Sequence, residues 1–142
     1  MSTDIVSATL SHVWRGYGSA IFLEFGALTP RTGRDGTASE PNGEFTLMIE
    51  WSWRIESETS ILCGSFSDEE VWPSIFEKLL GLHVREITLF GRLPEIDVSL
   101  CGGHHILSFS TTEGDPRWAL FDKRSKPHTW TRIVDGELFI GN

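Results

Sequence analysis

The sequence is poor in cysteine and has no long apolar run, and each shortage excludes a class of protein. Two cysteines, Cys63 and Cys101, in a chain of 142 residues cannot form the disulfide framework of a small secreted domain. No apolar run approaches the roughly 20 residues that cross a bilayer. The first residues have neither the cationic head nor the apolar stretch of a secretory signal. We therefore expect a cytoplasmic protein with free thiols and no membrane partner.

Positive charge is scarce as well. The chain has 12 Lys and Arg against 20 Asp and Glu, a formal net charge of -8. Such a field repels phosphate backbones unless a basic stripe forms locally. The two short basic clusters have acidic or neutral flanks, and we interpret them as solvated loop charge. They are Arg31 with Arg34, and Lys123 with Arg124 and Lys126. The sequence predicts no nucleic-acid partner, whereas a basic protein partner fits the sign of the charge.

Motifs for catalysis and metal binding are missing too. The chain contains neither a Gly-x-Ser-x-Gly nucleophile motif nor a Gly-x-x-x-x-Gly-Lys phosphate loop. His104 and His105 are adjacent on a predicted strand and point to opposite faces, so they cannot chelate one ion. A structural zinc site needs about four ligands, and Cys101 is the one further candidate nearby. We predict no metal and no cofactor, and a non-catalytic protein is favoured over an enzyme.

What the sequence does contain is the alternation of apolar and polar residues that marks strands with one buried face. The alternation is longest over residues 44–56, where the odd positions from Phe45 to Ile55 are large and apolar and include Trp51 and Trp53. At about 3.3 Å per residue, such a strand is too long to stay flat in a small domain. We expect it to bend or coil, with its odd-numbered side chains buried.

Shorter alternations and glycine pairs mark further strands and turns. Ile21–Phe25 and Ile96–Leu100 alternate in the same way, as does His105–Phe109, which predicts that His105 is a hydrogen-bonded core histidine. Gly102-Gly103 and Asp135-Gly136 provide the positive φ of tight hairpin turns.

A single amphipathic stripe predicts one helix at about residues 73–80, ended by Gly81. Pro73 is poorly tolerated inside a helix. Either it is the first helical residue after a separate turn at Ser67–Trp72, or it kinks a longer helix. A change of phase in the next strand predicts a β-bulge near Arg85-Glu86.

Two parts of the chain share one order of elements. About residues 9–56 contain three predicted strands and a Trp-x-apolar triplet, as do about residues 82–140, and residues 67–81 connect them. Two such units can bury apolar faces that neither could bury alone. We predict one domain over residues 1–142, α+β by class and dominated by β. Two similar three-strand halves would form a curled antiparallel sheet or a partly open barrel. The first half also contains residues 29–43, interpreted as a mobile insertion.

The second half carries a series of apolar and glycine landmarks. They are Leu79–Val84, Glu95–Leu100, Gly102–Phe109, Trp118-Ala119-Leu120 and Gly136-Glu137-Leu138. Across about residues 79–140 they resemble a family of small uncharacterised bacterial domains. Members of that family look like two copies of a strand-rich unit, and the family carries no established activity or catalytic residues. Similar small acidic domains turn up as immunity proteins beside secreted toxins, and the resemblance suggests an immunity-like role.

Four polar residues are candidates for a binding site. Glu24, Glu50 and Asp97 lie on outward phases of predicted neighbouring strands, and His104 follows the glycine turn. Paired carboxylates can catalyse hydrolysis when the pKa of one is raised. Acidic residues that alternate with Ser, Thr and Met are also typical of a solvated sheet face, so we assign no catalytic residue.

Two functions follow from these observations. The favoured one is a non-catalytic cytosolic protein-binding domain, immunity-like, with a basic protein partner. The alternative is a small-ligand-binding protein or hydrolase with its site in the mouth of the sheet or barrel, gated by residues 29–43. Four aromatic residues can form a stacking platform, although core and hairpin packing explains them more simply; they are Trp14, Tyr17, Trp72 and Trp130. Either function is compatible with a homo-oligomer.

Overall fold

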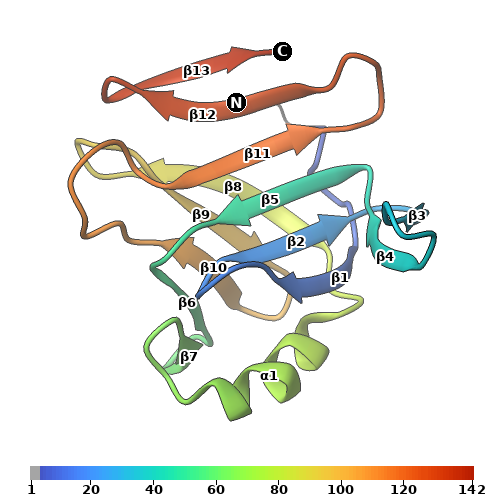
Figure 1. Ribbon diagram of the computed structural model, residues 1–142. Helices are drawn as coiled ribbons and strands as arrows, with labels where there is room; N and C mark the ends of the chain where they lie inside the picture. Colours follow the sequence, from blue (N-terminus) through green and yellow to red (C-terminus); the bar gives the residue numbers. More distant parts are fainter. Residues whose placement is uncertain (1–3) are drawn as a thin grey trace.

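Two antiparallel sheets packed face to face form the framework of the molecule, and the computed structural model describes residues 4–142 (Figure 1). The first sheet contains β1 (Leu10–Arg15), β2 (Ile21–Phe25), β5 (Phe45–Ile49), β11 (Trp118–Asp122), β12 (Thr129–Val134) and β13 (Glu137–Gly141), in the order β1-β2-β5-β11-β12-β13. The second contains β6 (Trp53–Glu56), β7 (Ile61–Gly64), β8 (Val84–Phe90), β9 (Glu95–Leu100) and β10 (His104–Ser108), in the order β7-β6-β10-β9-β8. The predicted β-dominated antiparallel class is confirmed, and neither of these sheets closes into a barrel.

The predicted long strand over residues 44–56 is divided between the two sheets. β5 ends at Ile49 and β6 begins at Trp53, and the chain crosses from one sheet to the other between them. At this crossing Trp51 adopts a φ of 68°, which interrupts the alternation and leaves its side chain 44% exposed. The expected bend is confirmed and Trp53 is fully buried, but the prediction that Trp51 is buried is wrong.

The helix predicted at about residues 73–80 is confirmed as α1 (Trp72–Leu79), with Pro73 in its first turn. A separate 3₁₀ turn, Glu69–Val71, precedes it, as the first of the two expected alternatives required. Gly81 follows with a φ of 92°. Within residues 4–142, no helix has the length and apolar character needed to cross a bilayer.

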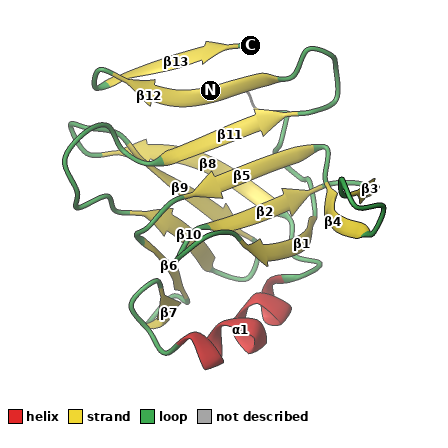
Figure 2. Ribbon diagram, viewed as in Figure 1, coloured by secondary structure: helices red, strands yellow, loops and turns green. Residues whose placement is uncertain are grey.

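The helix lies beside β1 and β7, which are edge strands of the two sheets, and completes the aromatic core (Figure 2). The ring of Trp53 lies 5.0 Å from that of Trp72 in an edge-to-face arrangement, and 5.9 Å from that of Phe76. Both indole N–H groups are satisfied inside the core: Trp53 Nε1 donates to the Ser19 carbonyl oxygen at 2.6 Å, and Trp72 Nε1 donates to the Gly64 carbonyl oxygen at 3.0 Å. Because the rings are buried and both indole N–H groups are hydrogen-bonded, these tryptophans stabilise the fold and neither leaves an unsatisfied indole N–H in the core.

The predicted turns are confirmed. Gly102-Gly103 joins β9 to β10, and both residues have positive φ. Asp135-Gly136 joins β12 to β13 with φ of 52° and 79°, the backbone that a two-residue hairpin requires. The Asp115 carboxylate accepts hydrogen bonds from both N–H groups of that turn at 3.0 and 2.9 Å. The bulge expected near Arg85-Glu86 appears as a register shift between β8 and β9.

Residues 29–43, interpreted from their composition as a mobile insertion, form a hairpin. Its strands are β3 (Thr29–Thr32) and β4 (Ala38–Asn42), and it projects from the end of β2 and β5 (Figure 1). Asp35 organises the tip, because its carboxylate accepts hydrogen bonds from the hydroxyl and the N–H of Thr37. These bonds hold the pKa of Asp35 below its ordinary value.

Both cysteines are free thiols, and their surroundings differ. Cys63 is buried, and burial raises the pKa of its thiol from 9.0 to about 11. Cys101 is only partly buried, next to the β9–β10 turn. A thiol reacts as its thiolate, so the two cysteines should differ in reactivity.

We expect Ellman's reagent at pH 8 to modify one thiol per chain in the native protein and both after unfolding. Cys101→Ser should abolish the native reaction and Cys63→Ser should leave it intact; the opposite result would contradict the burial of Cys63. Because the pKa of Cys63 is raised on folding, its contribution to stability is fully present below about pH 9 and is lost as the pH rises toward 11.

Candidate functional site

The four predicted binding residues do not converge on one site. Glu24 on β2 and Glu50 after β5 both belong to the outward side of the six-stranded sheet. Asp97 on β9 alternates with fully buried neighbours and points away from the core on the other sheet. His104 begins β10 with its Nδ1 atom buried and without a hydrogen-bond partner. Outward positions on two opposed sheets face in opposite directions, so no shared mouth brings these side chains together.

His105 was expected in the core and instead lies on the outward side of the five-stranded sheet. Ile106 and Ser108 are the fully buried positions of β10, so the core-facing phase is the even one. The ring Nδ1 of His105 lies 2.8 Å from Asp97 Oδ1. In the described residues no group of three His, Cys, Asp or Glu side chains is placed to hold a metal ion, so this pair stands as a surface contact.

The outward side of the six-stranded sheet carries five aromatic side chains together with one Met and one Arg. We name this set the aromatic face: Trp14, Phe22, Met48, Phe121, Trp130, Arg132 and Phe139. The strand register aligns them in two rows that cross the sheet. One row is Trp14, Phe22, Met48, Ala119, Arg132 and Phe139; the other is His12, Glu24, Thr46, Phe121, Trp130 and Gly141. Directly opposed residues on neighbouring strands contact each other, so the register makes one connected surface.

Ring stacking fixes this surface. Trp14 stacks on Phe22 with centroids 4.0 Å apart, and Phe121 stacks on Trp130 at 5.4 Å, each pair within 9° of parallel. The guanidinium of Arg132 lies 3.5 Å from the ring centroid of Trp130 and 4.5 Å from that of Phe139. These contacts hold the guanidinium between two rings, where cation–π attraction restricts its motion.

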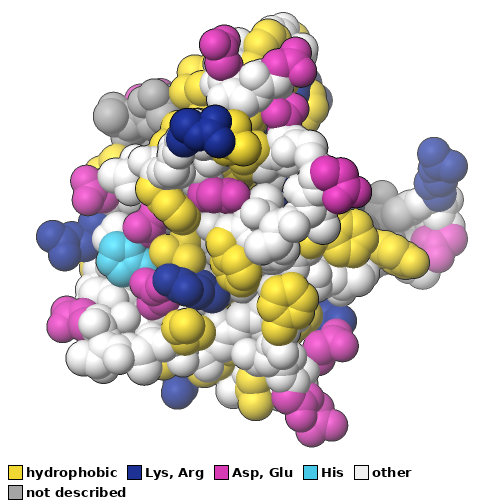
Figure 3. Space-filling view, turned by 90° about the vertical axis from the view of Figure 1, so that its left-hand side faces the viewer, with side chains coloured by type: hydrophobic (Ala, Val, Ile, Leu, Met, Phe, Trp, Pro, Cys, Tyr) yellow, Lys and Arg dark blue, Asp and Glu magenta, His cyan; other side chains and the backbone are white. Residues whose placement is uncertain are grey.

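The aromatic face is only partly covered by the protein. Phe139 is 44% exposed, and the other members are half-buried. Tyr17, which is 91% exposed, and Trp51 extend the exposed aromatic surface at one end. That end of the sandwich, with the β1–β2 and β5–β6 connections, faces the viewer in Figure 3, where hydrophobic side chains lie among charged ones. Of the four aromatic residues considered from the sequence, Trp72 is in the core as expected, whereas Trp14 and Trp130 belong to the aromatic face.

Glu24 lies within the aromatic face but is fully buried. Its carboxylate accepts three hydrogen bonds: from Trp14 Nε1 at 2.8 Å, from the Gly43 N–H at 2.9 Å and from the Thr46 hydroxyl at 2.5 Å. A Cβ atom on Gly43 would lie 2.5 Å from the Phe25 carbonyl oxygen, so a glycine is required for this approach. The carboxylate therefore orients Trp14 and fastens the base of the 29–43 hairpin to the sheet.

Two hollows share the floor of the aromatic face. The first, of about 350 Å³, lies beside Tyr17 and Trp51, with Glu50 at its rim. The second, of about 260 Å³, lies beside the hairpin and Phe121, and its rim carries Arg31, Asn42, Lys123 and His128. Both are bounded by Trp14, Phe22 and Met48, so they are two parts of one uneven apolar surface.

The rim of the second hollow is positively charged, against the sign of the whole chain. Lys123 Nζ donates to Asn42 Oδ1 at 2.8 Å. Partial burial lowers the pKa of Lys123, and the charge of Arg31 lowers it further, while Glu24 opposes both effects. The described residues that line this hollow include no exposed carboxylate.

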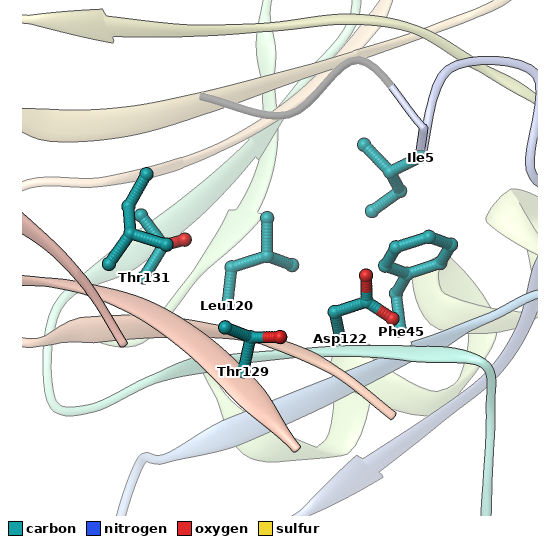
Figure 4. A pocket seen from close by; sticks show the side chains of 7 residues that line it. Ile5, Phe45, Leu120, Asp122, Thr129 and Thr131 are labelled. Atoms are coloured by element: carbon teal, nitrogen blue, oxygen red, sulfur yellow. The ribbon is translucent and has the colours of Figure 1, made fainter. Parts of the chain in front are cut away.

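A third hollow, shown in Figure 4, lies on the core side of the six-stranded sheet and offers little room. Its volume is about 120 Å³, below the several hundred Å³ of typical ligand sites. Its carboxylate, that of Asp122, is already bound by Arg124, whose hydrogen bonds hold the pKa of Asp122 below its ordinary value. The aromatic face is therefore a stronger candidate than this hollow.

The chain matches no protein-family model, and comparisons with curated proteins and with solved structures give no match. The resemblance of residues 79–140 to a bacterial domain family stays a prediction.

Proposed function

We propose that this chain is a non-catalytic protein-binding domain and that the aromatic face is its binding surface. The observation that carries the proposal is the composition of that face at positions open to solvent. Aromatic residues, Met and Arg are the residues enriched in the cores of protein interfaces, and Trp, Tyr and Arg dominate their hot spots. Here they form one connected set on six strands.

The rigidity of the surface supports the same function. Stacked rings on paired strands have few rotamers to lose when a partner binds, so little entropy opposes association. The guanidinium of Arg132 is held against Trp130 and Phe139 in the same way, with its Nη1 atom buried and without a hydrogen-bond partner.

The charge near the surface specifies the partner further. The net charge of -8 predicts a basic partner through long-range attraction. Contacts at short range depend instead on the rim of the second hollow, where Arg31 and Lys123 lie. We infer that the segment of the partner seated there carries acidic side chains between apolar ones, whatever the charge on the rest of the partner.

The immunity-like role, the cytoplasmic location and the two similar halves belong to this proposal as well. The strand order supports the halves: β1, β2 and β5 are neighbours in one sheet and β6 crosses to the other, whereas β8, β9 and β10 are neighbours in the second sheet and β11 crosses back. A binding protein built in this way needs no catalytic residue, which agrees with the absence of motifs from the sequence.

Capture from a lysate of the cells that encode the chain tests the proposal with two matched variants. Met48→Lys adds a charge at the centre of the aromatic face, and the lysine stem can still cover the neighbouring rings. Ile61→Lys makes a similar change at a 58% exposed position on β7, outside the face. We expect Met48→Lys to lower capture of a specific protein by about tenfold or more. Capture by Ile61→Lys should equal that of the wild type.

The captured protein should also be released by salt, because charged rim contacts are screened. Equal capture by all three proteins, or no captured protein at all, would overturn the proposal.

A small apolar ligand is the second candidate function, favoured by the first hollow. Its volume of about 350 Å³ is within the range of ligand pockets, and Trp14, Tyr17 and Trp51 line it. It lies on the outward side of a sheet and not in a barrel mouth, and Glu50 is the one predicted binding residue among those that line it. In native mass spectrometry, a bound small molecule that is absent from Met48→Lys would favour this function over protein binding.

A further inference from the structure

One edge of the six-stranded sheet lacks the protection that the other edges have. An unprotected edge strand offers a row of unpaired backbone groups to another strand. β8 is bulged and carries exposed Arg85 and Glu86, and β7 has only four residues. The start of β1 is joined to the segment after α1, where the Leu10 N–H donates to the Leu82 carbonyl oxygen at 2.8 Å. β13 has five residues, no bulge and no strand or loop bonded to its outer edge among the described residues, and its one charged residue is Glu137, next to the turn.

The three central residues of β13 are apolar. Leu138, Phe139 and Ile140 are consecutive, and their exposed fractions are 38%, 44% and 54%. Phe139 lies on the outward side with Arg132, so Leu138 and Ile140 lie on the core side of the sheet. Within the described residues, β13 pairs with β12 on one side and with no strand on the other. Both faces of this edge are therefore suited to burial against another strand.

The hairpin determines which backbone groups of β13 are free. In a two-residue hairpin the residues that flank the turn, here Val134 and Glu137, exchange hydrogen bonds. Hydrogen-bonded and non-hydrogen-bonded pairs then alternate, so Phe139 bonds to β12 and its two neighbours do not. The N–H and C=O groups of Leu138 and Ile140 therefore point to the open edge.

We propose that two copies of this chain pair through β13, antiparallel and related by a twofold axis at Phe139, to form one continuous sheet. In this register Leu138 of one copy lies opposite Ile140 of the other, and all of the free N–H and C=O groups of both residues form hydrogen bonds. In a register centred on Leu138, the N–H and C=O groups of Leu138 would bond to Leu138 of the second copy, and those of Ile140 would stay unpaired. A register centred on Ile140 would leave the groups of Leu138 unpaired in the same way. A register centred on Phe139 therefore makes the most hydrogen bonds.

The side chains fit this register as well. The two Phe139 rings meet at a non-hydrogen-bonded pair, where opposed side chains approach most closely. Glu137 lies opposite Gly141 of the second copy, so the two carboxylates do not oppose each other. On the core side, Leu138 and Ile140 form an apolar strip across the axis. The dimer also joins the two aromatic faces, edge to edge, into one surface twice as wide.

Sedimentation equilibrium tests the pairing directly. We expect the wild type to associate, with rising concentration, to twice the 16.0 kDa of one chain. Ile140→Lys should shift the dissociation constant upward by a factor of about 100 or more, since it puts a charge in the apolar strip. Ile61→Lys replaces the same residue type at a similarly exposed strand position on the other sheet and should dimerise like the wild type. Circular dichroism establishes that both variants are folded.

Cysteine cross-linking tests the register. In the proposed dimer, position 139 of one copy lies opposite position 139 of the other, with the two Cα atoms about 4.5 Å apart. This separation is within the range of a disulfide, so Phe139→Cys can be cross-linked. Ile140→Cys lies opposite Leu138, so its own copy is out of reach. Oxidation should yield a covalent dimer with Phe139→Cys and not with Ile140→Cys or the wild type.

A wild type that stays monomeric at millimolar concentration, a dimer that tolerates Ile140→Lys, or equal cross-linking at both positions would overturn the proposal. Because Ile140 lies on the core side of the sheet, Ile140→Lys leaves the aromatic face itself unchanged. The dimer and the proposed binding function therefore fail or succeed separately.

Discussion

Replacement of Trp53 by alanine is expected to lower the free energy of unfolding by about 3–5 kcal/mol, the usual cost of removing a large buried aromatic side chain. Trp53 is fully buried at the point where the chain enters the second sheet, and its ring contacts Trp72 and Phe76. The alanine variant leaves a cavity between the sheets and α1. It also leaves the Ser19 carbonyl without its indole donor. Urea denaturation monitored by circular dichroism measures the loss.

Trp53→Phe is the matched control. It keeps an aromatic ring in the core and removes the hydrogen bond to Ser19, so a loss of about 1–3 kcal/mol is expected. Trp51→Phe, two residues earlier, changes an exposed ring and should cost less than about 0.5 kcal/mol. If Trp51→Phe were as destabilising as Trp53→Phe, the division of the strand between the sheets would be contradicted.

Replacement of Glu24 by leucine is expected to lower the free energy of unfolding by about 3–5 kcal/mol, because the remaining buried polar groups of the network would be left without a partner. The Trp14 indole N–H, the Gly43 N–H and the Thr46 hydroxyl would all lose their acceptor in the buried site. Glu24→Gln keeps the shape and puts an amide NH₂ group against at least one of these donors. It should cost about 1–3 kcal/mol.

Denaturant titrations of both variants test this prediction. Near-UV circular dichroism should change as well, because the Glu24 carboxylate orients the Trp14 ring. A neutral effect of Glu24→Leu would contradict the structural role of the carboxylate. Glu24 was predicted from the sequence as a binding residue, and capture of a partner tests that role. Because its carboxylate is occupied by three donors of the protein itself, Glu24→Gln should alter capture only as far as it alters stability.

Local patterns were enough to predict many of the elements. β2 and β9, the Gly102-Gly103 and Asp135-Gly136 turns, and α1 each depend on residues close in sequence. Alternation distinguishes the two sides of a strand. It does not say to which of two sheets the strand belongs, and for this reason Asp97 and Glu24 appeared to be neighbours although their sheets are opposed.

The aromatic face was considered from the sequence but not favoured, for a related reason. Trp130 stands between two threonines and Trp14 between Val13 and Arg15, and neither pattern distinguishes a ring that faces inward from one that faces outward. β10 shows the same difficulty, because Leu107 is covered on the outward side while Ile106 faces the core. The β3–β4 pairing was not predicted for residues 29–43, and the bond that fastens the base of this hairpin joins Gly43 to Glu24, which is distant in sequence.

The two crossings between the sheets determine when the molecule can be completed during its synthesis. β5 pairs with β2 on one edge and with β11 on the other, and β6 pairs with β7 and with β10. In each case the second partner is synthesised much later than the first. A nascent chain that has emerged only as far as α1 therefore holds both strands with open edges. Contacts of such long sequence separation are formed slowly, on a scale of milliseconds to seconds. Until residues 104–122 leave the ribosome, β5 and β6 each keep one edge open to pairing with a wrong strand.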